Sequence, residues 1–72
     1  MAIETVRVEL LGASFTIQTD ESKDYVESLI AYLRSKVETV KATARVDDPL
    51  KVSILAAIFL VDELYRERLD AS

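Results

Sequence analysis

The sequence predicts an α+β fold in which an N-terminal β-hairpin is followed by two α-helices, the second helix long and forming part of a dimer core. Three patterns support this prediction. Apolar and polar residues alternate over residues 3–19, as they do in half-buried strands. Apolar residues recur every three or four positions over residues 22–42, as they do on one face of a helix. Within a second helical stretch, residues 49–70, the run from Val52 to Val61 contains only one polar residue, Ser53.

The small size of the chain explains why a partner is expected. With 72 residues, the chain is predicted to form one domain over residues 1–72. A domain of this size buries only roughly 60% of the surface of its unfolded chain, and it usually needs disulfides, a metal or a partner for stability. The sequence contains no Cys and no His, which excludes disulfides and argues against the common transition-metal sites. Oligomerisation is therefore the expected support.

The predicted hairpin has one apolar face, formed by Val6, Val8 and Leu10 on the first strand and by Phe15 and Ile17 on the second. A two-residue loop of Gly12 and Ala13 is predicted to join the strands as a type II′ turn, because Gly adopts the required positive φ without a Cβ clash. This turn predicts the cross-strand pairs Leu11–Ser14, Leu10–Phe15, Val8–Ile17 and Val6–Thr19.

The first helix is predicted over residues 22–42. Its apolar stripe consists of Val26, Leu29, Ile30, Leu33, Val37 and Val40. Either Asp20 or Ser22 is expected to cap its N-terminus, since both side chains accept hydrogen bonds from free backbone N–H groups.

The second helix is predicted over residues 49–70, with Asp48 as its N-cap and Pro49 at its first position. At ~1.5 Å per residue this helix is about 30 Å long, which is more than the hairpin can cover. Its apolar run is either intrachain core or part of a shared dimer core, and the small size of the chain favours the dimer. The residues predicted for the dimer interface are Leu55, Ile58 and Phe59. Asp62 and Arg66, four residues apart, are expected to form a solvated ion pair.

Four basic residues are the only positive concentration in an acidic chain: Arg34, Lys36, Lys41 and Arg45. They have two interpretations. One is a docking patch for an acidic protein partner. The other is a solvated helix face on which Arg34 pairs with Glu38, and the residues alone do not decide between them.

The composition argues against several classes of function. Without Cys or His, and with one Gly, the chain has no thiolate, no group that titrates near neutrality and no phosphate-binding Gly-rich loop, so we expect no enzyme and no cofactor. The adjacent carboxylates of Asp62 and Glu63 point about 100° apart on a helix, so no metal site is expected. The net charge of −4 argues against nucleic acid as a partner. The apolar run is well short of the ~20 residues of a membrane span, and no signal peptide is present, so a cytoplasmic protein is expected.

Two stretches of the sequence resemble one known family. VRVELLGASFTIQTDESKDYVESLIAYLRSKV resembles the start of the ZapA family of bacterial cell-division proteins, in which a V-x-V-x-[IL]-x-G hairpin precedes an acidic break and an amphipathic helix. LKVSILAAIFLVDELYR is similar to the family segment L-x-[IV]-x-A-A-L-N-I-A-D-E-L, with matches at Leu55, Ala56, Ala57, Ile58, Leu60, Asp62, Glu63 and Leu64.

The resemblance implies a non-enzymatic partner of FtsZ at the midcell division site, which dimerises through its head and cross-links filaments through a tetramer built on a long C-terminal coiled coil. It places basic partner-binding residues at Lys41 and Arg45. Phe59 stands where the family usually has Asn. Because the given sequence ends at Ser72, the long coiled coil is expected to be missing, and tetramer formation stays open. The alternatives are a structural dimerisation module for a different cytoplasmic complex and, third, a nucleic-acid regulator.

Overall fold

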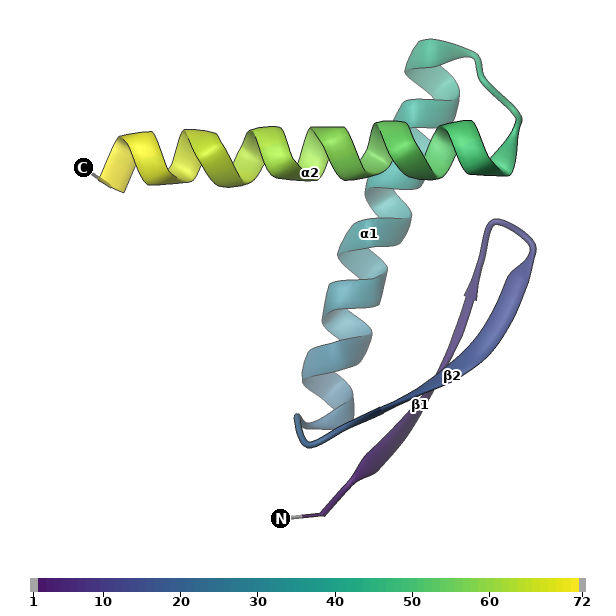
Figure 1. Ribbon diagram of the computed structural model, residues 1–72, viewed down its shortest axis with the longest axis vertical. Helices are drawn as coiled ribbons and strands as arrows, with labels where there is room; N and C mark the ends of the chain where they lie inside the picture. The colour runs from purple at the N-terminus through teal and green to yellow at the C-terminus, as the bar shows by residue number, and fades with distance from the viewer. Residues whose placement is uncertain (1, 72) are drawn as a thin grey trace. The chain divides into compact units, whose positions relative to one another are not determined.

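The computed structural model describes residues 2–71 and contains four elements: β1 (Glu4–Leu10), β2 (Ala13–Thr19), α1 (Lys23–Ala44) and α2 (Pro49–Ala71) (Figure 1). The predicted α+β order of a hairpin followed by two helices is confirmed. The chain forms two compact units, one up to Ser35 and the other from Lys36 onward, so that the boundary falls within α1.

The first unit contains an antiparallel hairpin whose register differs from the prediction. Val6 pairs with Ile17 and Val8 with Phe15. The loop is formed by Leu11 and Gly12, not by Gly12 and Ala13, and both loop residues have positive φ, 54° and 82°. Positive φ at both central positions is the signature of a type I′ turn, whose twist matches that of the strands.

The predicted type II′ turn is therefore wrong, because Leu11 adopts the left-handed conformation that the prediction reserved for Gly. The resulting shift of the register by two residues preserves the alternation of faces, since side chains alternate with a period of two. The apolar side chains of both strands consequently still lie on one face of the hairpin.

The core of the first unit is small and consists of Val6 and Val8 on β1 together with Val26 on α1, all buried. Arg34 of α1 donates a hydrogen bond from Nη2 to the backbone carbonyl of Glu9 at 2.7 Å, which joins the helix to the hairpin. Ser22 caps α1, since its Oγ accepts a hydrogen bond from the backbone N–H of Tyr25 at 3.2 Å. Of the two cap candidates, the structure therefore selects Ser22.

The second unit combines the part of α1 from Lys36 onward with α2. Asp48 caps α2 as predicted: its Oδ1 accepts a hydrogen bond from the N–H of Leu50 at 3.3 Å, and its carbonyl accepts one from the N–H of Val52 at 2.9 Å. Pro49 occupies the first helical position, where its missing N–H needs no partner. The buried side chains of this unit are Val37, Val40, Val52 and Ala56.

Candidate functional site

The second helix has two apolar faces, of which the chain covers only one. Val52 and Ala56 are buried. Ile54 follows Val52 by two residues, which places it about 160° around the helix at ~100° per residue. Its face carries four exposed apolar side chains at steps of four, three and four residues, here called the open stripe: Ile54, Ile58, Val61 and Tyr65. An exposed, contiguous apolar stripe of this kind marks a site of association.

The residues predicted for the dimer interface lie on and beside the open stripe. Ile58 belongs to the stripe and is 55% exposed. Leu55 is half-buried and Phe59 is 36% exposed, and both lie between the stripe and the buried face. Sequence reasoning missed Ile54, Val61 and Tyr65, although their spacing was present in the sequence. The helix is apolar nearly all round, and the sequence does not show which of its faces the chain covers itself. The spacing of these three residues could therefore not be distinguished from that of the other apolar residues of α2.

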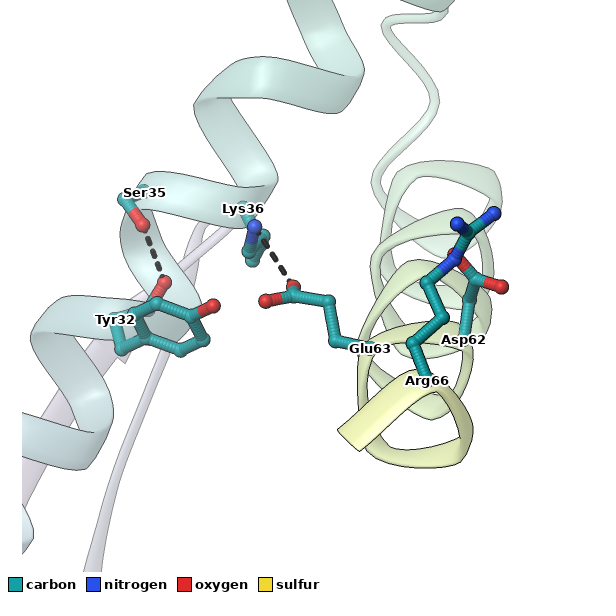
Figure 2. Close-up of polar contacts among 6 residues, drawn as sticks. All are labelled: Tyr32, Ser35, Lys36, Asp62, Glu63 and Arg66. Carbon is teal, nitrogen blue, oxygen red and sulfur yellow. Dashed lines mark hydrogen bonds and ion pairs between the residues drawn. The ribbon is translucent and has the colours of Figure 1, made fainter. Parts of the chain in front are cut away.

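An ion pair joins α1 to α2 inside the second unit. Lys36 Nζ lies 2.7 Å from Glu63 Oε2, and the two side chains are 25% and 35% exposed (Figure 2). Lys36 is one of the four predicted docking cations, but in the structure it binds a carboxylate of the same chain. The neighbouring Asp62 accepts a hydrogen bond from Arg66 Nε at 2.9 Å, as predicted. The two adjacent carboxylates of α2 therefore face different cations.

Two further docking candidates, Lys41 and Arg45, are exposed at the end of α1. Within residues 2–71, neither has a carboxylate within 4.0 Å. Arg45 directly follows the last residue of α1 and has a φ of 54°, the left-handed conformation that usually selects Gly at this position. Two cations with no carboxylate of residues 2–71 beside them are available to an acidic partner.

The fourth docking candidate, Arg34, does not form the ion pair with Glu38 that was considered as an alternative. Its guanidinium donates to the carbonyl of Glu9 in the hairpin. The ion pair of that alternative is therefore wrong, whereas the solvated helix face itself stays a prediction. Lys41 and Arg45 are the candidates that the structure leaves at the surface of the second unit.

The described part of the chain shows neither a cluster of metal-binding side chains nor a helix that could span a membrane. Residues 2–71 contain no group of three or more carboxylates that gather around a common point. Neither α1 nor α2 is long and apolar enough to cross a membrane.

An open apolar stripe on a helix, together with cations that face no carboxylate, defines a protein-association module. The family model described as "Cell division protein ZapA" matches residues 6–72. The chain belongs to the ZapA family, a family of non-enzymatic cell-division adaptors.

The chain is also similar to an uncharacterized protein of Treponema pallidum (strain Nichols), with 43% identity over 63 residues. The matched region covers 88% of this chain and 58% of the relative, so the chain spans less than two thirds of the length of that protein. No solved structure is significantly similar to the chain.

Proposed function

We propose that the chain is a cytoplasmic cell-division adaptor that binds FtsZ filaments at midcell as a homodimer and promotes assembly of the Z-ring. Residues 1–72 act as one head module in this proposal, without catalysis and without a cofactor. Membership of the ZapA family is the observation that supports FtsZ as the partner. The exposed cations and the open stripe of the second unit support the residues proposed below for the two kinds of contact.

Lys41 and Arg45 are proposed to contact the filament. Both are exposed and neither has a carboxylate within 4.0 Å in residues 2–71, so docking on an acidic surface breaks no ion pair of the chain. Charge complementarity of this kind increases both the association rate and the specificity. The positions also agree with the basic residues that the family resemblance indicates.

The dimer is proposed to form through α2, with Leu55, Ile58 and Phe59 in the interface together with the open stripe. Burying one large apolar side chain contributes roughly 1.5–3 kcal/mol. A second copy presents the same stripe, so a two-fold contact covers both stripes at once. The dimer then carries two identical filament contacts, which increases its avidity for a filament and allows it to bridge two filaments.

Co-pelleting with GTP-assembled FtsZ from the same source tests the filament contact. The double variant Lys41→Glu/Arg45→Glu is expected to reduce recovery in the pellet at least tenfold, because a docking cation is replaced by a repelling charge at two positions. The matched control is Lys23→Glu/Lys51→Glu, which changes the net charge equally. Both control residues lie in the first turns of helices, where negative charge is favoured.

The circular dichroism and dimer mass of the double variant are expected to equal those of the parent chain. Equal pelleting of the double variant and the parent would contradict the roles of Lys41 and Arg45. A folded dimer of the parent chain that stays in the supernatant would contradict FtsZ as the partner and favour a dimerisation module of another complex.

A further inference from the structure

A polar cleft lies between β1 and α1 in the first unit, and neither Lys41 nor Arg45 lines it. It is lined by Arg7, Glu27, Ile30 and Arg34 and has a volume of about 270 Å³. Pockets for small-molecule ligands usually measure about 300–1,000 Å³. The cleft therefore has the size for a single side chain of a partner and is small for a cofactor.

Glu9 holds both arginines of the cleft in place. Its Oε1 accepts a hydrogen bond from Arg7 Nε at 2.7 Å, and its backbone carbonyl accepts one from Arg34 Nη2 at 2.7 Å. A guanidinium has five N–H donors, so each arginine retains donors for a ligand after these bonds. The guanidinium groups of Arg7 and Arg34 are both hydrogen-bonded to Glu9. Holding them in place lowers the entropy cost of binding a ligand between them.

The charge of the cleft favours one carboxylate. Arg34 binds a carbonyl and, within residues 2–71, has no carboxylate within 4.0 Å, so its charge is not neutralised by the chain. Arg7 is neutralised by Glu9. Glu27 lies 4.0 Å from Lys23, which offsets its charge. The three cations, Arg7, Lys23 and Arg34, exceed the two carboxylates, those of Glu9 and Glu27, by one positive charge. This excess matches a monoanion better than a dianion.

We infer that this cleft binds the carboxylate side chain of an acidic protein segment. Arg34 is the principal contact, since its planar fork matches a carboxylate and its charge lacks a counterion. Arg7 supplies further donors, and Ile30 offers an apolar surface for the methylene groups of a Glu side chain. The cleft belongs to the first unit, so this inference does not depend on the proposed filament contact of the second unit.

An NMR titration of the ¹⁵N-labelled full chain with an end-blocked tetraglutamate peptide tests the inference. The Nε–Hε signals of Arg7 and Arg34 are expected to shift together on addition of the peptide. Arg34→Gln is expected to weaken binding about tenfold, since it removes a charge-assisted contact. The matched control, Lys51→Gln, changes the net charge equally at a cation on α2 and is expected to change affinity less than about twofold, because Lys51 does not line the cleft.

A second variant works in the opposite direction. Glu27→Gln removes the carboxylate that faces the ligand and is expected to tighten binding several-fold. A variant that merely damaged the fold would not produce this gain. Arg7→Gln, which breaks no bond to the backbone, is expected to weaken binding and replaces Arg34→Gln as the test if the latter fails to fold.

Three outcomes would overturn the inference. The first is a titration in which the peptide shifts neither arginine signal. The second is an equal loss of affinity in Arg34→Gln and Lys51→Gln, which would indicate only a general attraction of anions. The third is tighter binding of inorganic phosphate than of the peptide at the same two signals, which would assign the cleft to phosphate groups. None of these outcomes depends on FtsZ.

Discussion

Arg45 stands at a backbone position that favours a different residue. It adopts a φ of 54° directly after the last residue of α1. A residue with a Cβ pays about 1 kcal/mol for this conformation, whereas Gly adopts it freely. Gly would therefore end the helix better, and the presence of a strained arginine supports a role for its side chain.

Two substitutions separate the backbone strain at Arg45 from its charge. Arg45→Ala removes the charge and keeps the strain, whereas Arg45→Gly removes both. We expect the glycine variant to be more stable than the alanine variant by about 1 kcal/mol in urea unfolding. Both variants are expected to lose the same share of co-pelleting with FtsZ. If the alanine variant pellets like the parent chain, the arginine side chain plays no part in filament binding.

At the scale of the elements, local sequence patterns predicted the start of α2 correctly, whereas the residue types at the hairpin turn predicted the wrong loop residues. The helix start at Pro49 was predicted correctly because Asp48 and Pro49 form a local signal that needs no tertiary context. The hairpin loop was misplaced because Leu11 adopts a conformation that its residue type disfavours. The twist of the two strands outweighed that local preference, and a single sequence does not reveal such a compromise.

The partly buried ion pair between Lys36 and Glu63 is expected to stabilise the packing of α2 on α1. A double-mutant cycle with Lys36→Met and Glu63→Gln isolates its contribution. We expect a coupling free energy of about 1 kcal/mol, because two partly buried charges at 2.7 Å are shielded less by water than an exposed pair. The variants are compared by urea unfolding at one protein concentration, since the proposed dimer would make stability depend on concentration.

The exposed pair of Asp62 and Arg66 provides the matched control for this cycle. It lies four residues apart on one helix at 2.9 Å, with side chains 58% and 75% exposed. Its coupling is expected to be about 0.3–0.5 kcal/mol, as for other exposed helix pairs. Equal coupling in the two cycles would show that the pair between the helices adds nothing beyond a surface contact.

At the scale of the whole molecule, the division of α2 into two apolar faces could not be predicted from the sequence. The run from Val52 to Val61 is apolar nearly all round, so the pattern alone does not show which side chains the chain covers itself. In the structure Val52 and Ala56 are buried, whereas Ile54 and Ile58 are exposed. The uncovered apolar surface for which a partner is expected is therefore the open stripe of α2. We propose that a second copy of the chain covers it.

A charge placed on this surface tests the dimer. Ile58→Asp lies on the open stripe and Phe59→Asp beside it, and each would bury an unpaired carboxylate in the proposed interface, at a cost of several kcal/mol. Both variants are expected to sediment as monomers, or to unfold, at concentrations where the parent chain is a dimer. The control is Tyr25→Asp, which changes an apolar side chain of similar exposure, 51%, in the first unit and is expected to leave the dimer intact. A stable dimer of Ile58→Asp would exclude the open stripe from the interface, and a stable dimer of Phe59→Asp would restrict the interface to the stripe itself.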